Sequence, residues 1–478
     1  MLQRFINKSL ITRQSYGLLT KLRFNLNHRH FTSGTTGPRI CIVGAGPAGF
    51  YAAQYILKTL QDCKVDVIEK LPVPFGLVRF GVAPDHPEVK NVINTFTKTA
   101  ENSRFNFYGN VTLGRDVTLQ QLRDNYHAVL LTYGADQDRE LGLENETESN
   151  VLSARNFVAW YNGLPGAENL NPNLTGKSVT IVGQGNVAVD VARMLLSSID
   201  DLKKTDITSY ALETLVTSKV EQVYLVGRRG PLQVAFTIKE LREMLKLPNV
   251  TTQWRAQDFE GVAEVVDKLA RPRKRLTELM LKSLNEQSVA QPQNKKQFLP
   301  IFMRSPKQLK DNQLIFTVNK MQQDKAISTE KEESIPADLI LRSIGYKSSC
   351  ADNGICFDNQ TGRVFNEHGR VLKSLNDTTV DKGLYVAGWL GTGPTGVILT
   401  TMNGAFGVAK TICDDVLAKN IKTDDQKLGL QDMLKSHAVV TWQGWKKIDE
   451  EESKRGLLVG KPREKIVKIE EMLKVAGV

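Results

Sequence analysis

The sequence predicts an α/β protein made of two Rossmann-like dinucleotide-binding domains, the first discontinuous in the chain and the second inserted into it. An apolar run followed by Gly-x-Gly-x-x-Gly occupies residues 40–49, and the same order with Gly-x-Gly-x-x-Ala returns at residues 178–188. A further apolar run at residues 383–389 leads into another glycine-rich turn, which indicates that the chain returns to the first domain.

The first glycine-rich turn follows residues 40–43, which are typical of a buried parallel strand. Gly44 permits the tight turn, Gly46 lets the backbone approach a pyrophosphate, and Gly49 lets the next helix, expected to run to about residue 60, pack close to the strand. The phosphates would bind the free N–H groups at the helix start, where the helix dipole favours negative charge.

A second strand, predicted at residues 64–69, ends in Glu69, which is placed to accept a hydrogen bond from a ribose hydroxyl. The alternative is a glycine-rich turn without a ligand. A single Gly-x-Gly-x-x-Gly is weak evidence, but strand, glycines, helix, strand and acid in this order favour a nucleotide site.

The second turn contains Gly183, Gly185 and Ala188, but its next strand ends in Arg228 and Arg229 where the first fold has an acid. A carboxylate there would repel a 2′-phosphate, whereas a guanidinium binds a phosphate with two hydrogen bonds. The second nucleotide is therefore predicted to be NADPH rather than NADH. Solvated surface arginines are the alternative.

Residues 71–90 contain too many prolines and glycines for a helix or a central strand, so an ordered loop is expected there, lying along a flavin. His86 is the one histidine in this loop, and a structural histidine is the alternative to a functional one. A third glycine-rich loop, residues 391–396, offers N–H donors to an electron-rich ring, and Trp389 before it either covers that ring or packs in the core.

Other segments are assigned by their apolar patterns. Helices are expected at residues 91–100 and 237–247, helical character in an insertion at 198–219 and in a charged tail at 442–478, strands at 105–114, 127–134 and 337–346, and flexible polar loops at 287–296 and 322–333.

The first 36 residues differ from the rest of the chain, because no acidic residue precedes Asp62. Basic residues alternate with Ser, Thr and Asn, which is typical of a mitochondrial transit peptide cleaved after Arg29; a disordered basic tail is the alternative. Six of the eleven net positive charges lie here, so the remainder carries +5.

Two further features limit the function. No apolar run approaches the ~18 residues of a membrane span, so a soluble protein is expected. The five cysteines form no C-x-x-C pair, which disfavours disulfide reduction, and no metal site is expected.

A compact basic run occupies residues 271–275, with Lys268 just before it. It is either a solvated charge run or a docking patch for an acidic partner, which electrostatic attraction would steer. Nucleic acid is not expected as a partner, because the run lacks interleaved aromatic residues and a binding fold.

Two such nucleotide sites imply that a flavin and a nicotinamide meet, and that hydride passes between them once both rings are positioned. Electrons then leave singly to an external carrier, or react with oxygen at the flavin. A non-catalytic nucleotide-binding scaffold is a third possibility.

Four further runs of the sequence are distinctive: VPFGLVRFGVAPDHP at residues 73–87, GQGNVA at 183–188, VGRRGPLQVAFTIKELRE at 226–243 and GPTGVI at 393–398. These runs resemble the mitochondrial NADPH:adrenodoxin (ferredoxin) oxidoreductase family. The resemblance covers essentially everything after the transit peptide, to GKPRE at residues 460–464.

The resemblance implies a role for individual residues. FAD would contact Ala48, Glu69, Leu77 and Leu113, and Trp389, Gly396, Val397 and Ile398 would line the flavin. NADPH would be held by Gln184, Gly185, Asn186, Val187, Arg228, Arg229 and Glu240. The ferredoxin would dock on Arg242, Arg271 and Arg275, and His86 and Asp190 would form a catalytic pair near the flavin.

The resemblance also implies a domain order and a reaction. The transit peptide spans 1–36, the FAD-binding domain 37–138 and 348–478, and the NADPH-binding domain 139–347. NADPH would reduce FAD, which passes electrons one at a time to an acidic two-iron two-sulfur ferredoxin that supplies haem monooxygenases of steroid synthesis, iron–sulfur cluster assembly, or both. An FAD- and NADPH-dependent monooxygenase or oxidase is the alternative. A monomer is expected in the mitochondrial matrix, peripherally associated with the inner membrane.

Overall fold

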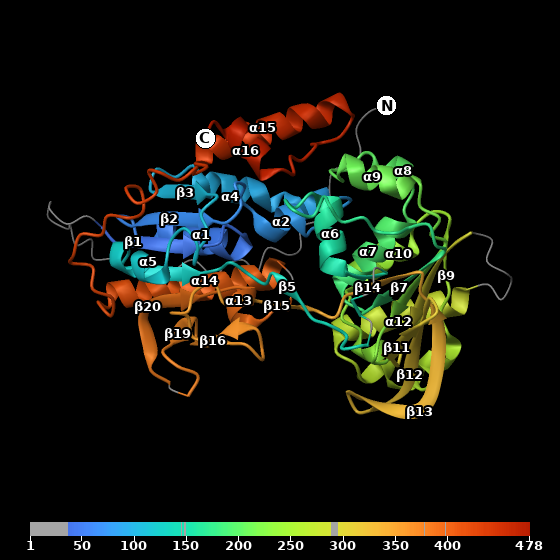
Figure 1. The fold of residues 1–478 in the computed structure, drawn as a ribbon. Coiled ribbons are helices and arrows are strands. Elements are labelled where there is room, and N and C mark those ends of the chain that lie inside the picture. Colours follow the sequence, from blue (N-terminus) through green and yellow to red (C-terminus); the bar gives the residue numbers. More distant parts are fainter. Residues whose placement is uncertain (1–36, 145, 148–149, 288–294, 377, 397) are drawn as a thin grey trace, which may run out of the picture. The chain divides into compact units, whose positions relative to one another are not determined.

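The computed structural model describes residues 37–478 except 145, 148–149, 288–294, 377 and 397 (Figure 1). Residues 37–478 form one compact unit. The predicted transit peptide, residues 1–36, and the predicted flavin residue Val397 lie outside the described residues.

The first of two large sheets has seven strands in the order β18-β19-β20-β4-β1-β2-β3. The strands from β20 to β3 are parallel, and β18 and β19 extend the sheet antiparallel. Because β20 pairs with β4, the chain does return to the first fold near its end. The strands are β1 (Arg39–Val43), β2 (Lys64–Glu69), β3 (Phe105–Gly109), β4 (Ala128–Leu131), β18 (Asn366–Glu367), β19 (Arg370–Leu372) and β20 (Val380–Val386).

The second large sheet has six strands, all parallel, in the order β6-β14-β7-β8-β10-β9. Its central strands β7 and β14 are buried at every Val, Ile and Leu that they carry, as expected for a sheet covered on both faces. They are β6 (Val151–Ser153), β7 (Ser178–Val182), β8 (Gln222–Val226), β9 (Val250–Thr252), β10 (Lys296–Ile301) and β14 (Leu339–Arg342).

Smaller sheets complete the strand inventory of the described residues. An antiparallel three-stranded sheet, β11-β12-β13, is attached to the second large sheet through a shared apolar core. These strands and the short paired ones are β11 (Arg304–Lys310), β12 (Gln313–Gln322), β13 (Lys325–Pro336), β5 (Gln137–Asp138), β15 (Tyr346–Lys347), β16 (Phe357–Asp358) and β17 (Arg363–Val364).

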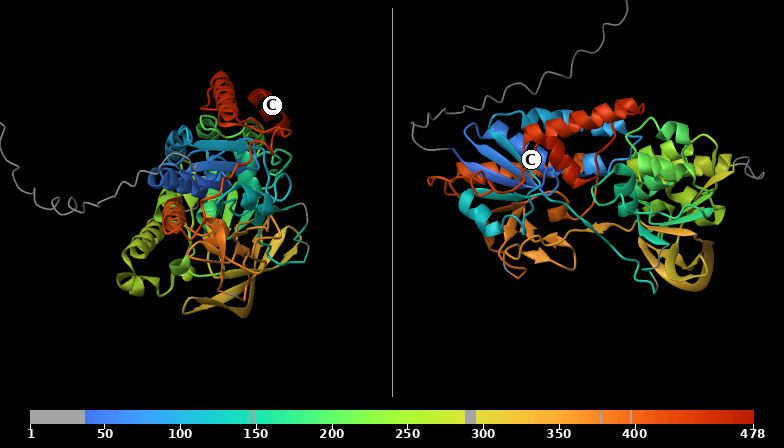
Figure 2. Two further views of the ribbon diagram at one scale, coloured as in Figure 1. Left: turned by 90° about the vertical axis from the view of Figure 1, so that its left-hand side faces the viewer. Right: turned by 45° about the horizontal axis from the view of Figure 1, so that its top comes forward.

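The C-terminal tail lies beside the helices of the first sheet (Figure 2), and its Trp442 and Trp445 belong to the apolar core of that sheet. Phe50 stacks on Phe96 at 5.0 Å between ring centroids, and Phe75 lies edge-on to Trp445 at 5.7 Å. The tail is therefore anchored on the first sheet by aromatic packing. The helices are α1 (Pro47–Thr59), α2 (Gly76–Phe80), α3 (Pro87–Lys90), α4 (Val92–Ala100), α5 (Leu119–Asn125), α13 (Trp389–Thr392), α14 (Ile398–Leu417), α15 (Trp442–Leu458) and α16 (Ile469–Ala476).

The helices around the second sheet enclose a core of their own, which includes Phe157, Trp160 and Met280. Among all the described helices, none has the length and apolarity that crossing a bilayer requires. The second set of helices is α6 (Ala154–Asn162), α7 (Asn186–Leu196), α8 (Ile199–Leu202), α9 (Ser209–Val216), α10 (Ile238–Leu245), α11 (Val262–Val265) and α12 (Arg271–Glu286).

Three expectations about local structure were wrong. The loop predicted at residues 71–90 contains the short helices α2 and α3. The flexible loop predicted at 322–333 is largely strand β13, which pairs along β12. The strand predicted to run to residue 114 ends at Gly109, because Asn110 turns the chain with φ +63°. Most of the loop predicted at 287–296 lies outside the described residues.

Candidate functional site

The first glycine-rich turn has the geometry that its predicted role requires. Gly44 has φ +107°, and a Cβ there would lie 2.8 Å from the Thr132 carbonyl oxygen, so only glycine fits. A Cβ on Gly49 would lie 2.2 Å from the carbonyl oxygen of Gly44, which shows how closely α1 approaches β1. A Cβ on Gly46 would meet no atom within 4 Å, so the space above this residue is open for a ligand.

Glu69 fixes the surroundings of this turn. Its carboxylate accepts hydrogen bonds from the backbone N–H of Ala45 at 2.8 Å and of Leu71 at 3.2 Å. Burial raises the pKa of Glu69, and these two amides oppose the rise. A carboxylate has lone pairs for further partners, so the arrangement leaves room for the predicted ribose hydroxyl.

The segment after Glu69 folds back over the same turn. The Phe75 N–H donates to the Ala45 carbonyl at 2.8 Å, and a Cβ on Gly76 would lie 3.2 Å from the Cα of Gly46. The 71–90 segment therefore lies against the first glycine turn and is partly helical, and its contact with a bound flavin stays a prediction. Leu77, on α2, is 45% exposed.

Other predicted flavin residues converge on this edge because the carboxyl ends of parallel strands share one edge of a sheet. Leu113 follows β3 and is buried. Gly388, at the end of β20, has φ +69°, and a Cβ there would lie 2.8 Å from the Cβ of Ala48 in α1. The turn after β20 thus touches the helix that starts at the first turn.

Trp389 begins α13 and stacks on Tyr346, with ring centroids 5.9 Å apart and 29° between the planes. Its indole Nε1 is buried and has no hydrogen-bond partner in the structure. An orphaned buried donor together with the open space above Gly46 fits a bound cofactor at this edge. Gly396 has φ +86° and Ile398 begins α14.

The second glycine-rich turn repeats the first. Gly183 has φ +127°, and a Cβ there would lie 2.1 Å from the Ser343 carbonyl oxygen, whereas a Cβ on Gly185 would meet nothing within 4 Å. Ala188 is fully buried on α7. In both glycine-rich turns, therefore, backbone atoms pack closely at the first glycine, and the space above the middle glycine, where a pyrophosphate would bind, is open.

Two residues predicted to hold NADPH have side chains engaged by the protein itself. The Gln184 Nε2 donates to the carbonyl oxygens of Leu225 at 3.2 Å and Ile301 at 2.9 Å, so it joins the ends of β8 and β10. The Asn186 Oδ1 accepts from the Thr237 N–H at 2.8 Å. Val187 packs on the core beside them, and Glu240 accepts from the Thr237 hydroxyl.

Arg228 and Arg229 follow β8 and are both exposed. Their carbonyl oxygens are held by the Asn319 Nδ2 at 2.8 Å and the Met303 N–H at 3.0 Å, so the backbone of this pair is fixed while the guanidinium groups remain accessible. Burial and the charge of Arg229 both lower the pKa of Arg273. Arg273 is thus a further cation near Arg229, which the sequence pattern did not assign there.

The predicted catalytic residues His86 and Asp190 belong to one charged cluster but do not bond directly in the structure. The His86 Nε2 lies 2.6 Å from the Glu243 Oε2. The buried Arg193 guanidinium contacts the Asp190 Oδ1 at 2.9 Å and the Glu243 Oε2 at 3.6 Å. The same group binds Asp85 through its Nε at 2.6 Å and its Nη2 at 3.0 Å.

Burial raises the pKa of Asp190, while Arg193 and His86 oppose that rise. Sequence reasoning missed Arg193, Asp85 and Glu243 as members of the cluster. Arg193 stands one helical turn after Asp190, which is a spacing that brings two side chains together and was a usable signal. The contacts to Asp85 and Glu243 join distant segments and left no local signal.

The predicted docking residues Arg242, Arg271 and Arg275 are exposed on α10 and α12, which contact each other. Within the described part of the chain, none of the three has an ion-pair partner within 4.0 Å. Lys274 differs, because its ammonium pairs with Asp267 at 2.7 Å. The basic run therefore presents free arginines and one neutralised lysine.

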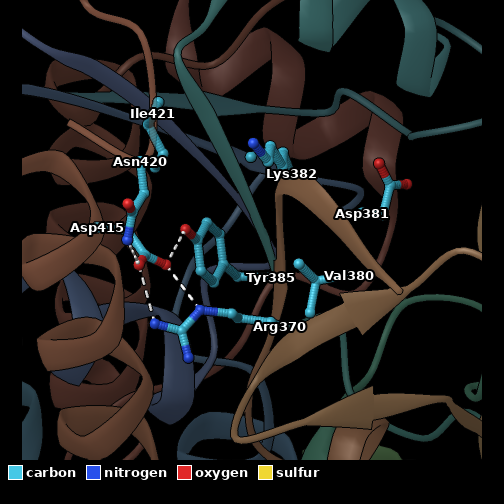
Figure 3. A pocket seen from close by; sticks show the side chains of 9 residues that line it. Arg370, Val380, Asp381, Lys382, Tyr385, Asp415, Asn420 and Ile421 are labelled. Atoms are coloured by element: carbon cyan, nitrogen blue, oxygen red, sulfur yellow. Dashed lines mark hydrogen bonds and ion pairs between the residues drawn. The ribbon is translucent and has the colours of Figure 1, made fainter. Parts of the chain in front are cut away.

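The hollows found in the surface lie elsewhere. One, of about 130 Å³, is lined by residues at the amino end of β20, opposite the glycine-rich turns (Figure 3). Asp415 there accepts from the Arg370 Nε at 2.8 Å, the Tyr385 hydroxyl at 2.7 Å and the Asn420 Nδ2 at 2.9 Å. Because these polar groups satisfy one another, this hollow is a weak candidate for a ligand site.

Two sheets with parallel cores, each with a glycine turn that is open above its middle glycine, define an oxidoreductase of the two-dinucleotide-fold class. Residues 38–265 match the pyridine nucleotide-disulphide oxidoreductase family. The chain is 68% identical to the mitochondrial NADPH:adrenodoxin oxidoreductase of Drosophila melanogaster, over 93% of this chain and 95% of that protein. The human enzyme of the same name is 46% identical, over 94% of each chain.

A solved structure of FprA from Mycobacterium tuberculosis in complex with NADPH is also similar, with 34% identity, a TM-score of 0.84, and coverage of 92% of this chain and 99% of that one. The chain belongs to the NADPH:adrenodoxin oxidoreductase family. The predicted fold class, family and enzyme class are thereby confirmed. The assignment of individual site residues and the domain boundaries remain predictions.

Proposed function

We propose that this chain is a mitochondrial flavoprotein reductase that uses NADPH to reduce an adrenodoxin-type ferredoxin. Its cofactors are FAD and NADPH. When bound, FAD accepts a hydride from NADPH and gives up electrons one at a time. The observation that carries the proposal is the pair of open glycine turns, the first followed by an acid and the second by two arginines, in a chain of this family.

The first turn binds FAD in this proposal. The N–H groups at the start of α1 bind the pyrophosphate, Glu69 binds a ribose, and the folded-back segment with Leu77 covers the ligand. The unpartnered Nε1 of Trp389 supports placing the flavin at this edge, since a buried N–H needs an acceptor. The remaining predicted flavin contacts are Gly44, Ala48, Gly49, Leu113, Gly396, Val397 and Ile398.

The second turn binds NADPH. Arg228 and Arg229 hold the 2′-phosphate, and Arg273 adds positive charge next to them. Gln184 and Asn186 support the turn through their bonds to backbone, so their contribution to NADPH binding comes from their own main chain.

His86 and Asp190 are the proposed catalytic pair. The short contact between the His86 Nε2 and the Glu243 Oε2 is a hydrogen bond along which a proton can move between a buried imidazole and a partly exposed carboxylate. Arg193 holds Asp190 beside the hydrogen bond between His86 and Glu243.

The partner is an acidic two-iron two-sulfur ferredoxin that docks on Arg242, Arg271 and Arg275. Their exposure and lack of ion-pair partners in the described residues support this, because free surface cations steer an acidic protein to its site. The ferredoxin in turn supplies steroid-hydroxylating haem monooxygenases, iron–sulfur cluster assembly, or both. We place the enzyme in the matrix as a monomer, peripherally associated with the inner membrane.

One assay separates this function from its rival. Purified FAD-loaded protein is given NADPH, with and without a two-iron ferredoxin, while ferredoxin reduction and oxygen uptake are both followed. We expect fast ferredoxin reduction and little oxygen uptake. Equal and stoichiometric oxygen uptake in both samples would instead identify an oxidase or a monooxygenase.

A further inference from the structure

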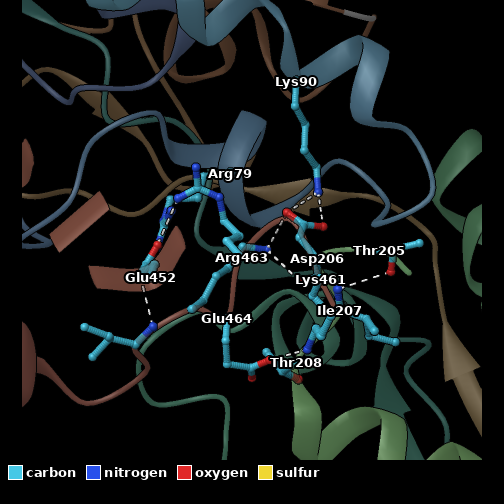
Figure 4. A network of polar contacts seen from close by, with 12 residues as sticks. Arg79, Lys90, Thr205, Asp206, Ile207, Thr208, Glu452, Lys461, Arg463 and Glu464 are labelled. Atoms are coloured by element: carbon cyan, nitrogen blue, oxygen red, sulfur yellow. Dashed lines mark hydrogen bonds and ion pairs between the residues drawn. The ribbon is translucent and has the colours of Figure 1, made fainter. Parts of the chain in front are cut away.

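The insertion at 198–219 and the C-terminal tail meet at one buried acid. Asp206 lies between α8 and α9, in the connection that joins two strands of the second sheet. Its carboxylate accepts from the Lys90 ammonium at 2.6 and 2.8 Å (Figure 4). The same carboxylate lies 3.1 Å from the Lys465 ammonium. Lys90 ends α3, which belongs to the first sheet's connections, and Lys465 belongs to the tail.

The three charged side chains are buried together. The exposed fractions are 10% for Asp206, 13% for Lys90 and 1% for Lys465. Burial alone would raise the pKa of Asp206, but the two ammonium groups hold it well below its usual range. Burial lowers the pKa of Lys465 to about 7, against the pull of Asp206. Each lysine therefore depends on this one carboxylate for compensation.

A second contact lies one residue along the tail. The Glu464 carboxylate accepts from the Ser209 N–H at 2.9 Å and from the Ser209 hydroxyl at 2.8 Å. Ser209 is the first residue of α9, so a carboxylate from the tail binds one of the free N–H groups at that helix start. Lys461 is bonded to the same carboxylate.

The tail is itself fixed to the first sheet's side. Glu452, fully buried on α15, binds the Arg79 guanidinium of α2, contacts Arg463 at 3.1 Å and accepts from the Ile466 N–H at 3.0 Å. Arg79 also lies over the Trp445 ring, 5.2 Å from its centroid. The tail segment 461–466, which we name the strap, is therefore held at one side by Glu452 and reaches the insertion at the other.

We propose that the strap, with Asp206 and Glu464 as positioning residues, holds the insertion of the second nucleotide fold against α3 of the first and thereby sets the spacing between the two bound nucleotides. This inference rests on the proposed function, because it concerns hydride transfer between NADPH and FAD. Hydride transfer is very sensitive to the separation of the reacting atoms, so a loosened strap should slow it.

The location of these contacts distinguishes the strap from ordinary surface ion pairs. Exposed pairs contribute little, and the pair between Asp200 and Lys203 in the insertion is of this kind, with its atoms 2.5 Å apart and the Asp200 side chain 80% exposed. Both partners of that pair lie on the same side, within α8 and its end. Asp200→Asn is therefore a matched control for Asp206→Asn, in the same insertion and with the same change of charge.

The experiment uses the full-length FAD-loaded enzyme. Rapid mixing with saturating NADPH measures the rate of flavin reduction, and reoxidation of the reduced enzyme by ferricyanide measures a step that needs no nicotinamide alignment. Amide hydrogen exchange on the enzyme without NADPH gives a readout independent of turnover, at residues 207–209 and 461–466. Glu464→Gln is tested alongside, in case Asp206→Asn does not fold.

We expect Asp206→Asn and Glu464→Gln to slow flavin reduction at saturating NADPH by about tenfold or more. Amide exchange should rise in both segments, with FAD content and ferricyanide reoxidation unchanged, and Asp200→Asn should match the parent enzyme. Wild-type flavin reduction rates in the folded variants would overturn the strap's role. If the parent enzyme itself is not reduced by NADPH, the proposed function fails, which is a different result.

Discussion

The guanidinium of Arg193 binds the carboxylate of Asp85 through two hydrogen bonds, of 2.6 and 3.0 Å. Arg193 lies on α7, the helix that starts at the second glycine turn, and Asp85 lies in the segment that folds over the first. The Arg193 side chain thus connects the helix that follows the second glycine turn to the segment that lies against the first. It also neutralises Asp190 in the predicted catalytic cluster.

Removing this guanidinium should destabilise the protein. Arg193→Met leaves Asp85 and the buried Asp190 without their cation, and breaking a buried pair in this way costs about 3 kcal/mol in the free energy of unfolding. Urea unfolding followed by circular dichroism measures the loss. Lys410→Met removes an exposed pair with Asp414 and should cost less than about 0.5 kcal/mol. An equal loss in the free energy of unfolding for the two variants would contradict the stabilisation of Asp85 and Asp190 by Arg193.

Two glycines of the first turn should respond differently to the same added methyl group. Gly49→Ala puts a Cβ 2.2 Å from backbone and should lower the melting temperature of the FAD-free protein. Gly46→Ala meets no protein atom, so it should leave that temperature unchanged but weaken FAD binding by filling the space left for the pyrophosphate. Calorimetry and FAD titration separate the effects. If Gly46→Ala binds FAD as tightly as the parent protein, the pyrophosphate does not bind above Gly46.

The arginine pair should set nucleotide choice. Arg228→Gln combined with Arg229→Gln removes the charge that holds a 2′-phosphate, so KM for NADPH should rise roughly a hundredfold or more while KM for NADH changes little. Steady-state kinetics with ferricyanide as acceptor measures both. Arg115→Gln, at an exposed arginine after β3, is the control. An equal rise for both nucleotides would argue against the 2′-phosphate assignment.

Ferredoxin docking should depend on two arginines of α12 and on salt. Arg271→Glu with Arg275→Glu should raise KM for ferredoxin by about tenfold or more at low ionic strength, and the difference should shrink in high salt. Lys282→Glu changes charge by the same amount per site on the same helix, and should have little effect. Flavin reduction by NADPH should be normal in both. If KM for ferredoxin is unchanged in the double variant, the ferredoxin docks on another surface.

Protonation of Asp415 should lower the free energy of unfolding in acid. Its burial alone would raise the pKa, but Arg370, Asn420 and Tyr385 outweigh burial and lower the pKa from 3.8 to about 2. The folded-state pKa is depressed, so the stabilisation is complete above pH 4 and is lost as the pH falls toward 2. The linked stability is about 2 kcal/mol. Denaturant titrations between pH 5 and 2 should show a shallower fall for Asp415→Asn than for the parent; parallel curves would exclude this contribution.

The two glycine turns were predictable because their geometry is set locally. Gly44 and Gly183 both need a positive φ, and the apolar strands before them are encoded in a few consecutive residues. Arg228 was predictable for the same reason, because its position after strand β8 follows from its spacing to the second glycine turn. The position of β20 beside β4 could be inferred only because a third glycine turn follows it.

The contacts between distant segments were not predictable in the same way. The pairing of His86 with Glu243 joins residues 157 positions apart, and that of Asp206 with Lys465 spans 259 positions. Neither leaves a periodic or compositional pattern. Strand β13 was missed because it is exposed along most of its length, so its polar residues lack the alternation that marks a half-buried strand.

Reduction of the bound flavin by NADPH in the absence of oxygen tests the central claim most directly, namely that the two glycine turns hold two nucleotides whose reactive rings meet. We predict that the purified protein is yellow, and that about one equivalent of NADPH bleaches the flavin before any ferredoxin is added. A protein that cannot take up FAD, or whose flavin colour survives excess NADPH, would contradict the account.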